Sequence, residues 1–210
     1  MEEHIERIRR KLARARARDT AFTVFGAANH RYALNPCLSE EELSAIERVL
    51  EISLPADYRE FLREMGNGGA GPEYGLYSLQ KSIAESFERS AFLAAPFPHT
   101  HAWNLDPHRF GAKDLSDGQF EMSPAALAAY EEEYFRDEHV QGALRIHTAG
   151  CNHDTLLVLN GAERGYVWHD ERTVDFGVFP YEGKPEPSAR LRFLAWYEDW
   201  LDNALKAVGG

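Results

Sequence analysis

The helix-and-turn segment at residues 54–76 constrains the fold of this chain more than any other part. It reads LPADYREFLREMGNGGAGPEYGL. Pro55 suits the first turn of a helix, where its missing N–H leaves no hydrogen bond unmade. Spacings of three and four residues give this helix one apolar face, formed by Tyr58, Phe61, Leu62 and Met65. Gly66 or Gly68 is expected to end the helix in the left-handed conformation, before a tight glycine-rich turn.

Hydrophobic spacing predicts the remaining elements. Helices are expected at residues 4–18, 39–51, 80–90, 123–139 and 188–208. Ser39 and Glu42 have the spacing of a capping box, which marks the start of the second of these helices. Strands are expected at residues 74–79, 144–147, 155–159, 166–168 and 174–179, with a further short one at 22–25. The last third of the chain is therefore expected to be a sheet followed by a helix.

The charge of the chain is unevenly distributed. The formal net charge is −11, and residues 1–19 contain seven basic and four acidic residues, a net of +3, so the rest carries −14. An acidic body repels nucleic acid and attracts basic partners, although such a charge also keeps ordinary proteins soluble. We predict no nucleic-acid partner, and we expect the basic first helix to pack on its own acidic domain.

Composition and segment lengths indicate where the protein works and how it is divided. No apolar run approaches the ~20 residues that cross a bilayer, and the N-terminus lacks the apolar stretch of a secretory signal. With Cys37 and Cys151 expected to be free thiols, this predicts a cytoplasmic protein without a membrane partner. We expect a basic helix and connector at residues 1–37 and a domain at residues 38–208, with an insertion near residues 91–121.

Three blocks of the sequence resemble the SUKH superfamily pattern. The first is residues 54–76 with the helix before them. The second runs from Ala149 to Asp170 and contains a glycine, an aspartate, a strand, a second glycine and the sequence VWHD. The third, FLAWYEDWLD at residues 193–202, is similar to the closing helix of the family. The resemblance covers roughly residues 38–205.

The resemblance implies an α+β fold in which helices surround a mostly antiparallel central sheet. Bacterial members of the superfamily are typically cytoplasmic immunity proteins that bind and neutralise toxins, many of them nucleases or nucleic-acid deaminases. Fungal members include regulators of cell-wall synthesis. The expected partner is therefore a cognate toxin domain of basic charge, and we expect a binding protein, not an enzyme. A non-toxin regulatory or scaffold module is the alternative; neither the toxin nor the oligomeric state can be predicted.

One cluster resembles an enzyme site. Residues 147–154 read HTAGCNHD and contain potential metal ligands. A structural zinc site needs four ligands, commonly in paired spacings, and the chain has no second cysteine-rich pair. Cys151 could alternatively act as a nucleophile with His147 or His153 as its base, but no protease-like signature flanks it. We assign no catalytic, cofactor-binding or metal-binding residue, and a metal- or cysteine-dependent enzyme remains a third hypothesis.

Partner-binding residues are expected where aromatic and acidic side chains lie beside turns and strand ends. Aromatic residues dominate interface hot spots, and exposed acids would meet a basic toxin. The predicted contact residues are Glu73, Tyr74, Tyr77, Trp103, Asp154, Trp168, Asp170 and Glu171.

Overall fold

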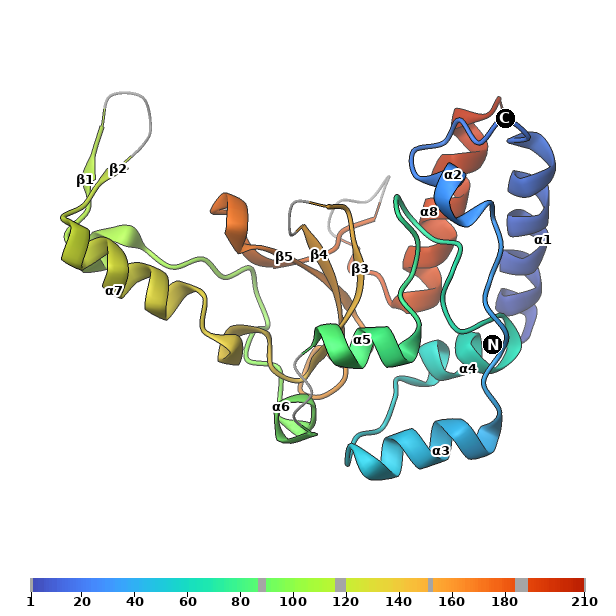
Figure 1. Ribbon diagram of the computed structural model, residues 1–210, viewed down its shortest axis with the longest axis horizontal. Helices are drawn as coiled ribbons and strands as arrows, with labels where there is room; N and C mark the ends of the chain where they lie inside the picture. The colour runs from blue at the N-terminus through green and yellow to red at the C-terminus, as the bar shows by residue number, and fades with distance from the viewer. Residues whose placement is uncertain (1, 87–89, 116–119, 151–152, 184–188, 210) are drawn as a thin grey trace.

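The centre of the protein is an antiparallel sheet. The computed structural model describes residues 2–86, 90–115, 120–150, 153–183 and 189–209. In these ranges four strands form the sheet in the order β3 (Ala143–Thr148), β4 (Asp154–Val158), β5 (Val167–Glu171) and β6 (Gly177–Pro180). Helices surround it (Figure 1). The α+β fold with a mostly antiparallel central sheet is therefore confirmed.

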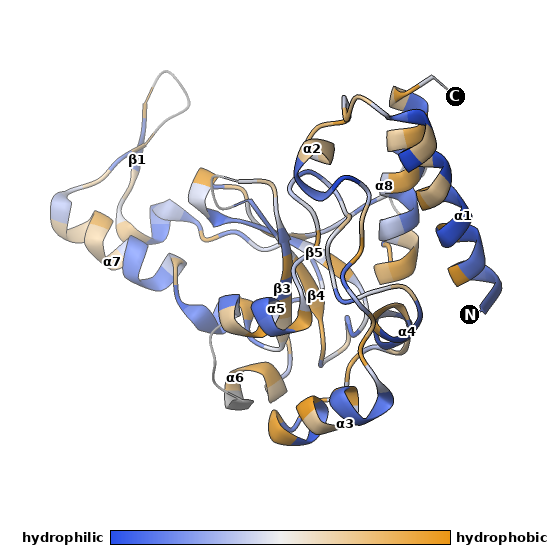
Figure 2. Cartoon of the chain, turned by 45° about the vertical axis from the view of Figure 1, so that its right-hand side comes forward, coloured by the Kyte–Doolittle hydropathy of each residue, from blue (hydrophilic) through white to orange (hydrophobic). Residues whose placement is uncertain are grey.

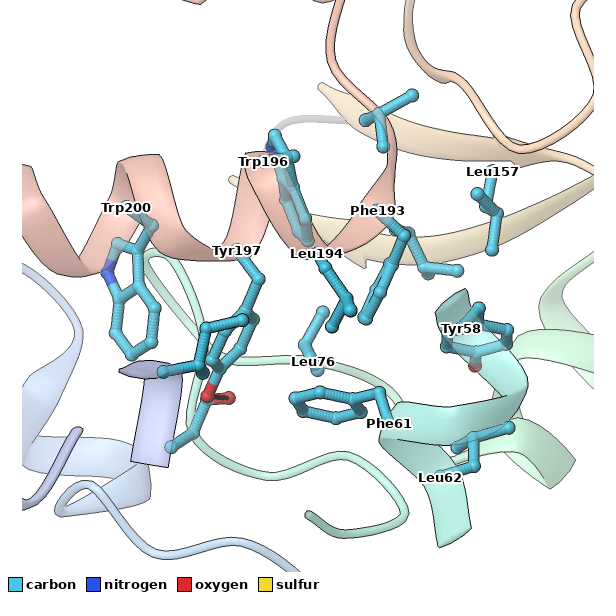
Figure 3. Packing of buried hydrophobic residues seen from close by; sticks show 14 of the residues in the cluster. Tyr58, Phe61, Leu62, Leu76, Leu157, Phe193, Leu194, Trp196, Tyr197 and Trp200 are labelled. Carbon is cyan, nitrogen blue, oxygen red and sulfur yellow. Dashed lines mark hydrogen bonds between the residues drawn. The ribbon is translucent and has the colours of Figure 1, made fainter. Parts of the chain in front are cut away.

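The first face of the sheet is covered by two helices that meet through aromatic rings. They are α4 (Ala56–Glu64) and α8 (Phe193–Ala207), shown in Figure 3. The ring of Phe193 contacts Tyr58 and Phe61 edge-on, with centroids 4.7 and 5.1 Å apart. Phe61 is fully buried, and burying such a side chain contributes about 1.5–3 kcal/mol. The helix predicted from the 54–76 segment thus forms the centre of the core.

The N-terminal helix α1 (Glu2–Arg18) belongs to the same core. Figure 1 shows it lying along α8. Its apolar side, which includes Ile5, Ile8 and Leu12, is buried. Its basic side pairs with α8 at Glu198 and Asp202. The expectation that this basic helix packs on its own acidic domain is confirmed.

The predicted start of the helix after Ser39 is confirmed, but two predicted strands are wrong. Ser39 and Glu42 form the capping box of α3 (Glu40–Val49). Residues 22–25 form a bend before the short helix α2 (Ala27–His30). Residues 74–79 contribute a single bridge, Gly69 to Leu76, and the start of helix α5 (Leu79–Glu85). The Tyr77 N–H still donates to the Ile146 carbonyl at 2.9 Å, so this loop borders the sheet without joining it as a strand.

Glycines give the turn after α4 its shape. Gly68 has φ +78°, and a Cβ there would lie 2.4 Å from the Tyr77 carbonyl oxygen. Only glycine fits that combination of left-handed backbone and close approach. Of the two candidate glycines, Gly68 is therefore the one in the left-handed conformation, and Gly66 is not among the glycines of positive φ.

The segment after α5 forms an arm that projects from the sheet (Figure 1). Its described elements follow α6 (Ser90–Ala94): η1 (Pro107–Phe110), the hairpin β1 (Lys113–Asp114) and β2 (Phe120–Glu121), α7 (Pro124–Tyr134) and η2 (Asp137–Val140). A small core of Leu105, Tyr130 and Tyr134 holds it together. We call residues 103–141 the arm; this unit overlaps the insertion predicted near residues 91–121 and extends beyond it through α7 and η2.

None of the helices within the described ranges is long and apolar enough to cross a membrane.

Candidate partner-binding surface

Aromatic side chains are exposed beside the turn that follows α4. Tyr74 is 50% exposed and Phe25 64% exposed. Their rings meet edge-on with centroids 5.6 Å apart. They belong to a surface around a groove of about 530 Å³, lined by His30, Tyr74, Tyr77 and Lys81 among others. We call Phe25, Tyr74 and this groove the turn surface.

Tyr77, which also lines the groove of the turn surface, has a cation over its ring. The Lys81 ammonium lies 3.8 Å from the centroid of the Tyr77 ring. A cation over an aromatic face is attracted by the ring quadrupole. Tyr77 is half-buried, so Tyr74 and Phe25 present more apolar surface here. Two predicted contact residues, Tyr74 and Tyr77, therefore share this groove.

Next to the turn surface, a row of polar side chains crosses the sheet on the side of α8. His147, Thr155 and His169 are register partners on β3, β4 and β5. Glu73 reaches His147 with a carboxylate-to-imidazole distance of 2.9 Å. The contact with His147 holds the pKa of Glu73 below its usual value, whereas burial lowers the pKa of His169.

The predicted acid Glu171 belongs to the same row. Its carboxylate lies 3.4 Å from Nδ1 of His153, and both side chains are partly exposed. Within the described part of the chain, no group of three or more His, Cys, Asp or Glu side chains could hold a metal ion. Cys151 lies outside the described residues, so the cysteine-based hypothesis stays a prediction.

The predicted acids Asp154 and Asp170 lie on the opposite face of the sheet, and both are buried. They are register partners on β4 and β5. Asp154 lies 3.0 Å from Nε of Arg145, and Asp170 accepts two 2.7 Å hydrogen bonds from Arg172. Burial, with the Asp170 charge adding to it, raises the pKa of Asp154, although Arg145 opposes the effect.

Asp154 and Asp170 therefore have mainly a structural role. Removing one partner of a buried pair leaves an uncompensated charge and costs about 3–5 kcal/mol. The pairs still line a pocket of about 280 Å³ at the base of the arm, with Phe135 and Asp137 on its other side. Asp154 and Asp170 line this pocket although they are only 6% and 5% exposed.

The two predicted tryptophans have different positions. Trp168 is fully buried in the second apolar cluster, where its ring contacts Phe97 at 5.0 Å. It offers no area to a partner, and its prediction as a contact residue is corrected to a core role. Sequence periodicity missed this because β5 lies between two covered faces. Trp103 is half-buried, and its ring stacks on His139 with centroids 4.0 Å apart.

Trp103 connects the arm to the sheet through hydrogen bonds. Its backbone exchanges two 2.8 Å hydrogen bonds with Val178 of β6. Asn104, the next residue, donates to the Asp175 carbonyl at 2.7 Å and accepts from the Tyr134 hydroxyl at 2.7 Å. The side chain of Trp103 therefore lies at the joint between arm and sheet.

Sequence reasoning missed several exposed apolar residues. Besides Phe25, they include Leu127 (41%), Phe135 (46%) and Phe176 (66%). The usable signal was in α7, whose sequence PAALAAYEEEY places apolar residues on all sides of the helix. A helix that is apolar all round is expected to be covered all round, yet α7 is covered on one side only.

Comparison with known proteins identifies the family. The SMI1 / KNR4 family (SUKH-1) matches residues 37–176, which are 140 of the 210 residues. This match starts one residue before the boundary predicted from the sequence and includes the whole arm. No curated protein and no solved structure matches the chain significantly. With two-thirds of its length matched, the chain belongs to the SMI1 / KNR4 family (SUKH-1).

Proposed function

We propose that this protein is a cytoplasmic immunity protein, which binds a basic bacterial toxin domain and neutralises it by protein–protein contact. The observation that carries the proposal is membership of the SUKH-1 family over residues 37–176. The net charge of −11 supports a basic partner, because opposite charges steer two proteins together and raise their association rate. In this mechanism the protein covers the active site of the toxin or the path of its substrate.

The chemistry of the described polar groups agrees with binding. Glu73 pairs with His147, Asp170 with Arg172, and Asp154 with Arg145. Each charge is thus held by a partner within the fold. What remains for recognition is the exposed aromatic and acidic surface, and hot spots of interfaces are built from such aromatic anchors within polar rims.

The test uses the purified toxin domain encoded by the gene next to the one for this protein. We expect saturable binding by calorimetry, inhibition of the toxin activity at matching stoichiometry, and weaker binding at high salt. Absence of binding, or binding that leaves the toxin fully active, would refute the proposal. A chain whose gene has no toxin gene beside it, and whose binding partner is a host regulatory protein, would instead fit the scaffold alternative.

A further inference from the structure

Helix α7 has one covered side and one open side. Tyr130 and Tyr134 face the small core of the arm and are buried. Leu127, Glu131 and Phe135 follow one another at intervals of four residues, so they form a row on one face of the helix. All three are exposed, with Leu127 at 41% and Phe135 at 46%. This row is the outer face of α7.

Leu127 lies three residues before Tyr130 and seven before Tyr134, so it borders the buried stripe of α7, and Phe135 caps the helix after Tyr134; both large side chains are nevertheless exposed. A solvated helix face normally carries polar side chains opposite the buried stripe. On α7 the exposed side opposite the buried Tyr130 and Tyr134 instead carries alanines, at residues 125, 128 and 129. The colouring of Figure 2 shows pale and hydrophobic stretches on α7 beside hydrophilic ones. An apolar stripe that the fold leaves open is a mark of an interface.

The arm carries a large share of the negative charge. Residues 103–141 contain nine acidic and three basic residues, a net of −6 of the −11 of the whole chain. Glu131 and Glu132 are exposed, and no described residue forms an ion pair with either. Glu133 and Glu138 share the single guanidinium of Arg136, at 3.2 and 3.4 Å. The excess charge on α7 is therefore free to act on a partner.

The outer face is also held in a fixed orientation. Arg172, whose guanidinium is buried, donates to the Tyr134 carbonyl at 3.1 Å and to the Arg136 carbonyl at 3.0 Å. These bonds satisfy carbonyls at the end of α7, which otherwise have no partner in the helix. The stacking of Trp103 on His139 fixes the same end. A surface that is ordered before binding loses less entropy when it binds.

We propose that the outer face of α7 is the docking surface for the partner, and that its occupant is a basic protein surface with an apolar centre. Leu127 and Phe135 provide the desolvated contact, while Glu131 and Glu132 pair with arginine or lysine side chains around it. Phe135 also borders the 280 Å³ pocket where Asp137 lies, which extends the acidic surface toward the sheet. This inference rests on the proposed function and names the surface that performs it.

The turn surface is the competing location, and its charges fit a basic partner less well. Glu73, the acid beside Tyr74, is occupied by His147 at 2.9 Å. The neighbouring Tyr77 ring is covered by the Lys81 ammonium at 3.8 Å. A basic protein would meet the Lys81 cation here and a carboxylate that already contacts His147, whereas on α7 it would meet unpaired glutamates.

The experiment compares three double variants of the full chain. L127A/F135A removes the apolar centre, and E131Q/E132Q removes two charges at nearly constant shape. F25A/Y74A is the matched control, because it removes two exposed aromatic rings from the turn surface. Exposed positions are chosen so that each variant keeps its fold, which thermal unfolding checks. The probe is the purified toxin domain from the adjacent gene, and the readouts are the dissociation constant and its dependence on salt.

We expect L127A/F135A to weaken binding by about tenfold or more, as truncation of interface anchors does. E131Q/E132Q is expected to slow association and to flatten the salt dependence, and F25A/Y74A to change affinity by less than about twofold. Equal affinity of all three variants and the unchanged chain overturns the inference, as does a loss confined to F25A/Y74A, while the proposed function stands. An unchanged chain that does not bind the toxin at all overturns the proposed function and this inference with it.

A second readout locates the contact directly. In the complex, amide hydrogen exchange should slow at residues 124–136 and stay unchanged at residues 66–77. The opposite pattern contradicts the inference even if the variants are ambiguous. Dimerisation of the free protein through α7, detected by sedimentation and abolished by L127A/F135A, would also overturn it, since the occupant would then be a second copy.

Discussion

Substituting Glu198 tests whether the N-terminal helix is an integral part of the domain. The Glu198 side chain is 12% exposed, and its carboxylate contacts Arg7 at 2.5 Å, Lys11 at 2.7 Å and His4 at 2.8 Å. The hydrogen bond from Arg7 is the largest cause that lowers the pKa of Glu198, from 4.5 to about 2. Because one pH unit of pKa change is worth about 1.36 kcal/mol, this corresponds to about 3 kcal/mol.

The expected loss of stability is smaller than that figure. Arg7 is 48% exposed, so solvent screens part of the interaction, and Lys11 keeps a second partner in Asp202 at 2.6 Å. We expect Glu198→Gln to lower the free energy of unfolding by about 1–2 kcal/mol at pH 7. Urea unfolding, followed by circular dichroism, measures this difference.

The pH dependence makes this prediction specific. A carboxyl whose pKa is lower in the folded state than in the unfolded state stabilises the fold above pH 4.5, and this contribution is lost as pH falls toward about 2. The difference between the unchanged chain and Glu198→Gln should therefore shrink over that window. Glu64→Gln is the control, because Glu64 is 43% exposed with one ion pair at 3.4 Å, and it should change stability by less than about 0.5 kcal/mol. Equal effects of the two substitutions would refute the reasoning.

Three further substitutions test the core, the turn and the joint of the arm. Phe61→Ala should cost about 3–5 kcal/mol in urea unfolding, because it empties a fully buried site; a loss below about 1 kcal/mol would contradict the packing. Gly68→Ala should cost more than Gly111→Ala, since both have positive φ but only Gly68 would bring a Cβ against a carbonyl. The His99 ring stacks on Trp103 at the joint, with centroids 5.2 Å apart. Burial lowers the pKa of His99 from 6.5 to about 4, so stability should fall as pH decreases through that window, and His99→Phe should reduce the fall.

The sequence predicted best those elements that are stabilised by interactions between residues close together in the chain. The capping box at Ser39 and Glu42 satisfies backbone groups within one turn, so its sequence pattern is enough to locate the start of α3. The apolar stripe of the α4 helix is likewise set by spacing alone, and Phe61 and Leu62 are fully buried as expected. Such patterns are reliable because the physical cause lies within a few residues.

The predictions that failed did so because of contacts between residues that are distant in the sequence, or because of the backbone conformation. Residues 74–79 have the composition of a strand, but Gly75 at φ +93° bends the backbone and α5 begins at Leu79. Val49 continues the apolar spacing of α3, yet it is 75% exposed, whereas Leu43 of the same helix is fully buried. Asp170 resembles a surface acid in the sequence, and only the fold shows that Arg172, two residues later, turns back to neutralise it.

The candidate site was only partly predictable for a related reason. Tyr74 was found because it follows a glycine-rich turn, and turns lie on the surface. Leu127 and Phe135 were not found, because an apolar residue in a helix is normally buried and only the missing cover on α7 reveals them. A sequence pattern states which faces of a helix are apolar; it does not state how many of those faces the rest of the chain covers.

The division between covered and open faces also explains how one fold can serve different partners. The core residues of α4, α8 and the sheet pack against one another, so substitutions among them reduce stability, as estimated for Phe61. The arm contacts the sheet mainly through Trp103, Asn104 and Arg172. Its outer face is exposed, so we expect most substitutions there to change stability by less than about 0.5 kcal/mol. Selection for a new partner can therefore act on α7 while the joint and the core stay the same, which is the arrangement expected when recognition is added to a stable scaffold.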